Sequence, residues 1–368
     1  MNDAFFIGRT LALAARARGK TSPNPMVGAL VVKKGRVISE GYHKKAGSPH
    51  AEVIAIDDAG IRAKGATLFV SLEPCCHRDK RTPPCTQKII SSGIRKVVIA
   101  MEDPNPKVSG KGIEELRNAG IRVVSGILRK KAEKLNESYI KHITTGMPFV
   151  ILKVAMTLDG KIATPEGESK WITGEKARRL VHRLRGQADG LLTAIGTVKA
   201  DNPRLTCRTG RYKNPVRIII DPDLKIALDS CVLETPPETI IVTRRPGGGQ
   251  VWPAEKDDKK KKLLAMNVRL LEYGGEEIDL FLLMKDLGKT GLVSVLVEGG
   301  SSLNSHCLES GIVDKVMFFV APKIIGGKRS VTAVGGEVFR SLSEAHRIDG
   351  LKVRRCGEDI LIEGYVSG

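Results

Sequence analysis

A histidine, a glutamate and two cysteines between residues 50 and 85 have the types and the spacing of a catalytic metal site. His50, Cys75 and Cys85 are the kinds of ligand that zinc prefers. Three protein ligands leave the fourth position of a tetrahedral zinc ion open to water, which is typical of catalytic rather than structural sites. Because zinc lowers the pKa of a bound water from 15.7 toward about 7, hydroxide would be available at neutral pH.

Glu52 stands two residues after the histidine and is not needed to bind the metal. We expect it to be the catalytic residue that carries protons between the water and a leaving nitrogen. The order His-x-Glu, Pro-Cys and a later Cys is the signature of zinc-dependent base deaminases. A lone histidine at a helix start is usually only a cap, but two cysteines and Glu52 accompany this one, which favours a metal site.

The size and composition of the chain indicate two globular domains. Its 368 residues are 41% hydrophobic, enough for two cores and too long for one ordinary domain. No apolar run approaches the roughly 20 residues needed to span a bilayer, and the segment from Asp3 to Arg18 has the spacing of a folded helix rather than of a signal peptide. Seven cysteines, an odd number, indicate no disulfide framework. Thiolate ligands suit a reducing compartment, so we expect a cytoplasmic protein without a membrane partner.

The formal net charge of +19 has two interpretations. It would suit a nucleic-acid binder that contacts phosphates, or an enzyme for small phosphorylated molecules with a generally basic surface. Aromatic residues make up only 4% of the chain, which argues against a stacking platform for single strands. The densest basic run is Lys259 to Lys262. We expect residues 256–262, which contain it, to form a solvated surface loop. We therefore expect no nucleic-acid partner.

Strands and helices alternate along the first half, which predicts an α/β sandwich with a partly parallel sheet. Strands at 27–33 and 37–40 flank Lys34-Gly35, a typical hairpin turn. His50 and Cys85 would lie at helix starts and Cys75 after a strand, where α/β sheets assemble sites and helix dipoles favour thiolates. The remaining expected elements are helices at 52–58, 86–92 and 112–119, and strands at 67–72, 97–101 and 121–124.

A domain boundary is expected between residues 135 and 148, where Thr144 to Pro148 breaks the pattern. Residues 1–145 and 146–368 would then be the two domains. The second α/β pattern lacks Gly-x-Gly-x-x-Gly after an early strand, so an ordinary Rossmann fingerprint is absent. Instead, Gly299-Gly300 lies between the strand expected at 293–297 and the helix expected at 301–308. Backbone N–H groups at such a turn can bind phosphate, although these turns often serve only close packing.

Motifs along nearly the whole chain resemble one family, the bifunctional RibD family of riboflavin biosynthesis. In the first half they are Pro23-Asn24-Pro25, Gly41-Tyr42-His43, Pro49-His50-Ala51-Glu52, Leu72-Glu73-Pro74-Cys75, Thr82-Pro83-Pro84-Cys85 and Asp103-Pro104-Asn105-Pro106. In the second half they are Thr157-Leu158-Asp159-Gly160-Lys161, Trp171-Ile172-Thr173, Asp201-Asn202-Pro203-Arg204-Leu205, Val297-Glu298-Gly299-Gly300 and Ala321-Pro322-Lys323. Nine residues separate Cys75 from Cys85, whereas general nucleobase deaminases place the second cysteine three residues after the first.

The resemblance implies a cytidine-deaminase-like α/β/α sandwich followed by a dihydrofolate-reductase-like α/β domain. The first would deaminate 2,5-diamino-6-(5-phospho-ribosylamino)pyrimidin-4(3H)-one by hydrolysis with zinc-bound hydroxide. The second would use NADPH to reduce the ribosyl group of 5-amino-6-(5-phosphoribosylamino)uracil to ribityl. One zinc ion per chain and a homo-oligomer, a dimer or a tetramer, are also implied.

The resemblance also assigns site residues by matching position. The deaminase substrate would be held by Asn24, His43, Arg81, Asp103 and Asn105. NADPH would be held by Ala155, Trp171, Thr197, Asp201, Gly300, Ser301, Ser302, Leu303, Asn304, Ser305 and His306. The reductase substrate would be held by Lys153, Ser169, Arg185, Leu205, Arg208 and Glu298. Two simpler interpretations stay open, since Asn24 could only shape a turn between prolines and Arg185 could be one of several basic residues on a helix face.

The chain departs from the family pattern between the two cysteines. Cys76 stands where serine is usual, one residue is inserted and a glycine is missing. Either Lys80 or Arg81 could therefore contact the substrate phosphate, and Cys76 or His77 could in principle replace a metal ligand. Cys75 is kept as the ligand because it directly follows Pro74, as the motif requires. Pro222 also stands where the family often has a serine that contacts the cofactor.

Two other functions remain open on the residues alone. A tRNA or DNA base deaminase with a nucleic-acid-binding C-terminal half would agree with the positive charge, but not with the cysteine spacing or the few aromatic residues. A structural metal clip in an RNA-binding module would need a fourth protein ligand, such as Cys76 or His77. That second alternative leaves Glu52 without a task.

Overall fold

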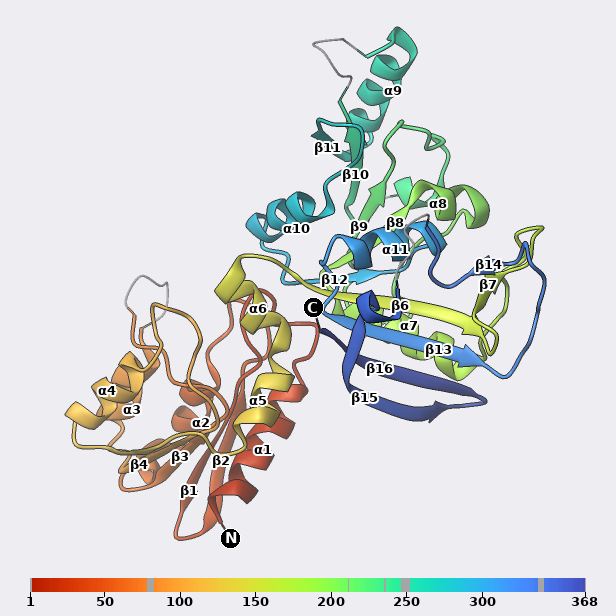
Figure 1. The fold of residues 1–368 in the computed structure, drawn as a ribbon. Coiled ribbons are helices and arrows are strands. Elements are labelled where there is room, and N and C mark those ends of the chain that lie inside the picture. The colour runs from red at the N-terminus through yellow and green to blue at the C-terminus, as the bar shows by residue number, and fades with distance from the viewer. Residues whose placement is uncertain are drawn as a thin grey trace. The chain divides into compact units, whose positions relative to one another are not determined.

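The computed structural model describes residues 2–77, 83–210, 212–234, 236–245, 252–336 and 341–367. The chain forms two compact units, Met1–Met147 and Pro148–Gly368, each built around its own sheet (Figure 1). The first unit carries the His-x-Glu and Pro-Cys motifs, and the second carries the Gly299-Gly300 turn. Within the described ranges, no helix combines the length and the hydropathy that crossing a bilayer requires.

The sheet of the first unit has the strand order β2-β1-β3-β4-β5. The β1 strand is antiparallel to both β2 and β3, and the remaining neighbours are parallel. Lys34 and Gly35 have φ values of 50° and 73°, as a two-residue hairpin turn requires, so the predicted hairpin is confirmed. The strands are β1 (Gly28–Lys33), β2 (Arg36–Tyr42), β3 (Thr67–Val70), β4 (Lys96–Ile99) and β5 (Arg122–Val124).

Two glycines bring helices close to this sheet from opposite sides. A Cβ atom at Gly28 would lie 2.2 Å from the Thr10 carbonyl of α1, and one at Gly41 would lie 2.5 Å from the Ala51 carbonyl of α2. Gly28 pairs with Tyr42, the neighbour of Gly41, so the two glycines face opposite sides of the sheet. The unit is therefore an α/β/α sandwich. Its helices are α1 (Asp3–Ala15), α2 (Ala51–Ala59), η1 (Gly60–Ala63), α3 (Cys85–Ser91), α4 (Lys111–Asn118), α5 (Arg129–Leu135) and α6 (Glu137–Thr145).

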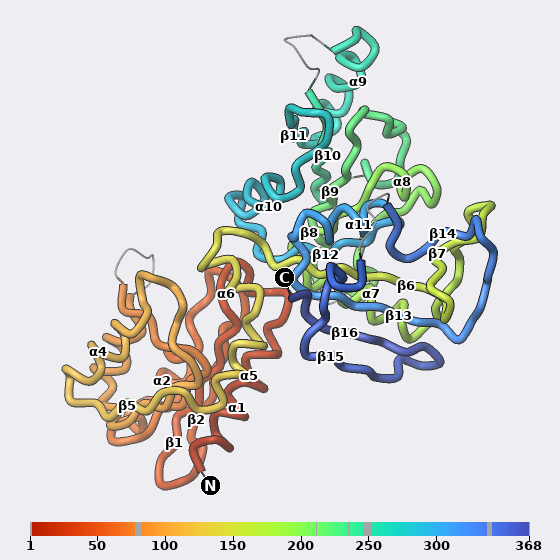
Figure 2. Tube along the Cα trace, in the orientation of Figure 1, coloured from red at the N-terminus to blue at the C-terminus, as the bar shows by residue number. Residues whose placement is uncertain are grey.

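The larger sheet of the second unit has the order β11-β10-β9-β8-β12-β6-β13-β16-β15. Pairing is parallel from β11 to β13 and antiparallel for β16 and β15. The β6 and β13 strands lie far apart in the sequence but pair side by side (Figure 2). The strands are β6 (Phe149–Thr157), β7 (Lys161–Ala163), β8 (Gly190–Ala194), β9 (Val216–Ile220), β10 (Thr239–Arg244), β11 (Arg269–Tyr273), β12 (Ser294–Val297), β13 (Lys315–Ala321), β14 (Val331–Thr332), β15 (Arg347–Cys356) and β16 (Asp359–Ser367), with β7 and β14 forming a separate small sheet.

The first helix of the second unit shows how its sequence divides into two stripes. Ala177, Leu180, Val181 and Leu184 of α7 pack against Phe319 of β13 and Leu361 of β16, as expected for apolar residues at helical spacing. The polar residues 178, 182 and 185 share another stripe of the same helix. The helices of this unit are α7 (Glu175–Gln187), α8 (Ile195–Asp201), η2 (Cys231–Leu233), α9 (Ala254–Ala265), α10 (Leu280–Lys289), α11 (Ser301–Glu309) and η3 (Leu342–Glu344).

The basic run from Lys259 to Lys262 lies in α9 and not in a loop, so that expectation was wrong. Lys261 and Lys262 pair with acidic residues one turn earlier, and Lys260 pairs with Glu272 of β11. Lys259 donates a 2.9 Å hydrogen bond to the carbonyl of Leu224. Opposite charges four residues apart favour a helix, and buried Leu263 attaches it to the core.

Candidate active sites

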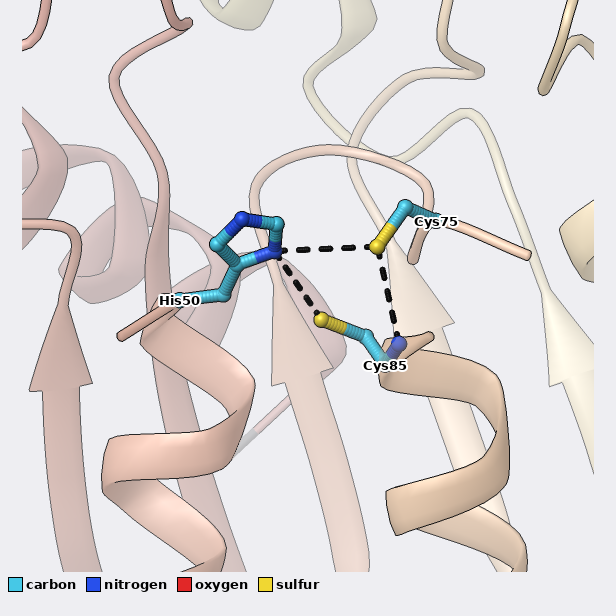
Figure 3. Close-up of side chains that lie close together, drawn as sticks. All are labelled: His50, Cys75 and Cys85. Carbon is cyan, nitrogen blue, oxygen red and sulfur yellow. Dashed lines mark hydrogen bonds between the residues drawn. The ribbon is translucent and has the colours of Figure 1, made fainter. Parts of the chain in front are cut away.

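The three predicted metal ligands converge from three separate segments of the first unit (Figure 3). His50 is the N-cap of α2, Cys85 is the first residue of α3, and Cys75 follows β3. His50 Nδ1 lies 3.1 Å from Cys85 Sγ and 3.6 Å from Cys75 Sγ. The Cys85 N–H donates to Cys75 Sγ at 3.5 Å, which suits a thiolate at a helix start.

This geometry fits a zinc ion. Ligand atoms about 2.0 to 2.3 Å from a tetrahedral zinc lie about 3.3 to 3.8 Å apart, and all three donor atoms here lie within 4.8 Å of one another. In the part of the chain that the structure describes, they are the only such group of histidine, cysteine and acidic side chains. Cys76 and His77 are not members of it, and Cys76 Sγ instead lies 4.0 Å from the carbonyl of Lys107. Neither of these two residues therefore provides a fourth donor atom to the group.

Glu52 lies one residue into α2 and is only 3% exposed. Its Oε2 atom is buried without a hydrogen-bond partner. Burial raises the pKa of the Glu52 carboxyl, and the charge of Cys75 adds to this, while His50 opposes it. A buried carboxylate oxygen without a partner is costly, so this oxygen of Glu52 suits a group that the protein itself does not supply.

His43, which is buried, and Asn24, which is partly buried, form a pair beside the metal ligands. Asn24 Nδ2 lies 3.2 Å from His43 Nε2, and His43 Nδ1 lies 3.2 Å from the Pro49 carbonyl. Because a carbonyl only accepts, Nδ1 carries the proton and Nε2 accepts from Asn24. Burial lowers the pKa of His43, and its ring packs edge-on at 5.5 Å from that of His50. The structure therefore brings these two predicted substrate residues together at the site.

Asp103 and Asn105 lie in a loop that a buried carboxylate holds in place. Glu73 accepts hydrogen bonds from the backbone N–H groups of Asp103, Gly110 and Ile113 at 3.0 to 3.1 Å. Asp103 Oδ1 in turn accepts from the Asn105 N–H and from the Tyr139 hydroxyl, both at 2.9 Å. The sequence did not indicate these supporting roles of Glu73 and Tyr139, although Glu73 directly precedes the Pro-Cys motif.

The same loop reaches the metal ligands through its apolar side. Val108 is 1% exposed and packs against Cys75 and Cys85. Asn105 Oδ1 accepts from the Lys107 N–H at 3.0 Å, so this side chain also shapes the loop. Arg81 and Lys80, the other residues predicted to hold the substrate, lie outside the described residues.

Glu298 is the centre of a buried ionic cluster in the second unit. Arg185 Nε and Nη2 donate to its two carboxylate oxygens at 2.6 and 3.0 Å, and Lys153 Nζ lies 2.9 Å from Oε2. Burial would raise the pKa of the Glu298 carboxyl, but the charges of Arg185 and Lys153 outweigh it and hold that pKa well below its usual range. Three residues predicted to hold the reductase substrate are thus brought together by ion pairs.

The other residues predicted for the reductase substrate differ in exposure. Leu205 is 3% exposed and has a φ of 50°, whereas Arg208 is exposed and Ser169 is half-buried. Arg185 Nη1 also lies 3.4 Å from the Thr206 carbonyl, so all three guanidinium nitrogens have partners within the protein. Of the two arginines, exposed Arg208 is therefore the one more available to bind a substrate phosphate.

The predicted cofactor segment forms the turn between β12 and α11. Gly300 is the N-cap of α11, and no side chain caps this helix end, a geometry that fits a phosphate. Asn304 Nδ2 donates to the Ala333 carbonyl at 2.8 Å and its Oδ1 is buried without a partner. Ser305 donates to Glu309 at 2.5 Å. The side chains of Asn304 and Ser305, and that of buried Leu303, therefore serve the protein interior, which leaves the backbone and the exposed Ser302 facing outward.

The remaining predicted cofactor residues come from elements around this turn. Thr197 Oγ1 of α8 lies 4.0 Å from where a Gly300 Cβ would stand. Asp201 pairs with Lys170 at 3.0 Å, and Trp171 is 62% exposed, with the Arg178 guanidinium 4.6 Å from its ring centre. Ala155 lies on β6 and His306 on α11.

Comparison with known proteins agrees with both halves. Residues 2–101 match the family described as cytidine and deoxycytidylate deaminase zinc-binding region, and residues 148–362 match the RibD C-terminal domain. Among curated relatives, riboflavin biosynthesis protein RibD of Aquifex aeolicus is 44% identical, over 98% of this chain and 97% of its own length. The same protein of Actinobacillus pleuropneumoniae is 42% identical, over 100% of this chain and 96% of its own.

Solved structures give the same result. Acinetobacter baumannii RibD superposes with a TM-score of 0.88 at 36% identity, covering 100% of this chain and 99% of that one. A diaminohydroxyphosphoribosylaminopyrimidine deaminase/5-amino-6-(5-phosphoribosylamino)uracil reductase from Thermotoga maritima superposes with a TM-score of 0.86 at 38% identity, covering 99% of both. The chain therefore belongs to the RibD family of riboflavin biosynthesis, as a bifunctional enzyme with a zinc-binding deaminase domain and a reductase domain.

Proposed function

We propose that this chain deaminates 2,5-diamino-6-(5-phospho-ribosylamino)pyrimidin-4(3H)-one and then reduces the ribosyl group of the product, 5-amino-6-(5-phosphoribosylamino)uracil, to ribityl with NADPH. The observation that carries the first step is the donor group of His50, Cys75 and Cys85 beside the unpartnered Oε2 of Glu52. Support for the second step is the RibD C-terminal domain match together with the ionic cluster around Glu298.

In the first step His50, Cys75 and Cys85 would hold the metal. When bound, zinc supplies a water of lowered pKa and polarises it for attack. Glu52 Oε2 would take one proton from that water and give it to the ring nitrogen, and would then take the second proton, from the hydroxyl of the adduct, and give it to the departing amine. The new C–O bond replaces the C–N bond, and ammonia leaves, so the step consumes one water and needs no other reactant.

The His43 and Asn24 pair would position the pyrimidine. Asn24 Nδ2 donates a hydrogen bond to His43 Nε2. This fixes the orientation of the Asn24 amide and leaves its carbonyl oxygen available as an acceptor. Asp103 and Asn105 shape the neighbouring loop, and we assign them to the substrate through that loop. Arg81 is kept as the candidate for the phosphate on the family resemblance alone.

In the second step the Glu298 cluster would fix Lys153 beside the ribosyl group. NADPH, when bound, supplies the hydride. The uncapped start of α11 would hold a cofactor phosphate, and Trp171, Thr197, Asp201 and Ala155 would lie around it. Arg185 is engaged by Glu298, so we assign the substrate phosphate to Arg208 and place Arg185 behind it, with Ser169 and Leu205 completing the substrate site.

A single incubation tests both steps. The purified protein with zinc, NADPH and the diaminopyrimidine phosphate should release ammonia and lose the absorbance of the reduced nicotinamide. When the deaminated uracil is supplied instead, NADPH should still be oxidised but no ammonia should be released. Ammonia without NADPH oxidation would contradict the reductase assignment, and neither signal would contradict the whole proposal.

Location and assembly belong to the same proposal. In the part of the chain that the structure describes, the seven cysteines form no disulfide bond, which suits the reducing cytoplasm. We expect the chain to form a homodimer or homotetramer, in keeping with the family resemblance. Light scattering of the purified protein at several concentrations distinguishes these from a monomer.

A further inference from the structure

The peptide unit between Thr206 and Cys207 is fixed on both of its sides. Its carbonyl, that of Thr206, lies 3.3 Å from His182 Nδ1 and 3.4 Å from Arg185 Nη1. Its N–H, that of Cys207, donates to Asn214 Oδ1 at 2.8 Å. A carbonyl oxygen has two lone pairs, and here both have a donor. Because the peptide unit is planar, these contacts together determine its orientation.

This peptide unit lies between two residues of the proposed reductase site, Leu205 before Thr206 and Arg208 after Cys207. Leu205, on one side, has a φ of 50°, a conformation that side chains other than glycine adopt only when the surroundings hold them there. Arg208, on the other side, is the exposed cation to which we assign the substrate phosphate. The direction in which Arg208 leaves the backbone therefore depends on what holds the Thr206 carbonyl.

His182 and Arg185 reach this carbonyl from successive turns of α7. Residues 178, 182 and 185 share the polar stripe of that helix. A separate, apolar stripe of the same helix packs on β13 and β16. A Cβ atom at Gly186 would lie 2.8 Å from Cys207 Sγ and 2.4 Å from Tyr212 Cβ, so α7 is in close contact with Cys207 and Tyr212. Arg185 is held at its other end by Glu298.

We propose that His182 is a positioning residue of the reductase site, whose Nδ1–H fixes the Thr206 carbonyl and thereby directs Arg208 toward the phosphate of the substrate. The inference rests on the proposed reductase function and goes beyond it, because His182 is not among the residues assigned to either step.

The protonation of His182 agrees with this role. The Thr206 carbonyl only accepts, so the ring nitrogen that faces it carries a proton. Burial, and after it the charges of Arg185 and Arg208, lower the pKa of His182, whereas the hydrogen bond to Thr206 and the Glu298 carboxylate act in the opposite direction. At pH 7.5 the ring is then neutral, with its proton on Nδ1.

Two amide substitutions separate positioning from simple packing. The His182→Asn amide can stand near the place of Nδ1 and donate to the Thr206 carbonyl, whereas His182→Gln carries its amide farther out, near the place of Nε2. Loss of one hydrogen bond to a fixed carbonyl weakens binding by roughly 3- to 10-fold. We expect His182→Ala and His182→Gln to raise the KM for the phosphorylated uracil by about that factor, with kcat within about twofold of wild type, and His182→Asn to restore KM.

The controls use the whole two-domain protein. Arg183→Ala removes an exposed basic residue of the same helix and should leave KM unchanged. The substrate without its phosphate should show no difference between wild type and His182→Ala, and the ammonia-releasing step should proceed normally in every variant. Equal KM values for wild type and His182→Ala, or equal rescue by asparagine and glutamine, would overturn the inference.

A binding measurement keeps the inference separate from the proposed reaction. Inorganic phosphate is titrated into wild type, His182→Asn and His182→Gln, and phosphorus NMR measures its affinity for each protein. In wild type, nitrogen-15 NMR of the imidazole shows which ring nitrogen of His182 carries the proton. We expect His182 of wild type to be the Nδ1–H tautomer, and we expect the phosphate affinity to fall in His182→Gln but not in His182→Asn. Wild-type protein that binds phosphate but oxidises no NADPH would overturn the proposed function alone, whereas an Nε2–H tautomer would overturn the role of His182.

Discussion

Each unit of this enzyme has a buried glutamate at its candidate site, Glu52 in the first and Glu298 in the second, and the two differ in their partners. Glu52 in the first unit has a buried oxygen without a hydrogen-bond partner, and burial raises its pKa. Glu298 in the second unit accepts from Arg185 through both oxygens and pairs with Lys153, which lower its pKa. A carboxyl that is costly to ionise can exchange protons during a reaction. A carboxylate that is firmly ionised cannot do so easily, but it can hold cations in place.

Burial alone therefore does not give a glutamate a catalytic role. What distinguishes the two glutamates is whether the protein supplies the compensating charge. In the first unit the chain compensates the charge of Glu52 only in part, through His50, and one carboxylate oxygen has no partner. In the second unit the chain supplies the compensating charge, and the product is a rigid framework for the residues around it.

The largest expected effect is at Glu52. Glu52→Gln keeps the shape of the side chain but cannot carry the proton, so deamination should fall by several orders of magnitude. Zinc content, measured on the purified variant, should stay near one ion per chain, since glutamate is not among the ligands. The variant should still oxidise NADPH when given the deaminated uracil, and normal ammonia release would contradict the assignment.

Breaking the Glu298 cluster should have the next largest effect. Glu298→Ala leaves Arg185 and Lys153 as buried cations without a counter-charge, a change that destabilises proteins by about 3 to 5 kcal/mol. The second unit should unfold at lower denaturant concentration and reduction should be lost. Glu298→Met combined with Arg185→Met should be less destabilising than the sum of the two single changes. Additive losses would show that the pair is not coupled.

The same cluster predicts a dependence on pH. Because the folded-state pKa of Glu298 is depressed, its contribution to stability is complete above the ordinary glutamate pKa of about 4.3 and is lost as pH falls toward the folded-state value. The difference in unfolding free energy between wild type and Glu298→Gln should therefore be constant from pH 6 to 8 and shrink on acidification. A gap that widens in acid would contradict the ionised state of Glu298.

Arg208→Ala should have a smaller, more selective effect. Loss of a charged hydrogen bond corresponds to roughly 10- to 150-fold in binding, so the KM for the phosphorylated uracil should rise within that range. Zinc content and ammonia release should be unchanged. Loss of both activities together would indicate misfolding, and an unchanged KM would move the phosphate contact away from this arginine.

The smallest expected effect is at Tyr139, which supports the first site only indirectly. Tyr139→Phe removes the hydrogen bond to Asp103 but keeps the buried ring, so stability should fall by about 0.5 to 1.5 kcal/mol. Deaminase KM should rise by a few fold while kcat is kept, because Asp103 shapes the loop beside the metal ligands. A fall in kcat without a change in KM would instead place Tyr139 in the chemistry.

Short motifs made the donor group predictable from the sequence. His50, Glu52, Cys75 and Cys85 stand at the starts of helices and the end of a strand, and such ends converge in α/β folds. The supports of these residues were not predictable in the same way. Glu73 contacts a loop some 30 residues later, and Glu298 meets a partner 113 residues away, contacts that only the folded chain creates.

Elements without an apolar periodicity were also missed. The α6 helix occupies the stretch expected to be a break between domains, and its only buried residue is Tyr139. The β15 strand is exposed along nearly its whole length, so no alternation marks it, and its pairing with β16 determines its conformation. The charged α9 helix resembles a loop in composition because its stability comes from ion pairs and few buried contacts.

The central claim is that three protein ligands bind the metal and leave one position to solvent. X-ray absorption at the zinc edge of the purified enzyme tests it most directly. We predict two sulfur neighbours near 2.3 Å, one imidazole nitrogen and one further light atom, with that last atom exchanging when a competing small ligand is added. Four donors from the protein, with a third sulfur or a second imidazole, would contradict the account of the deaminase site.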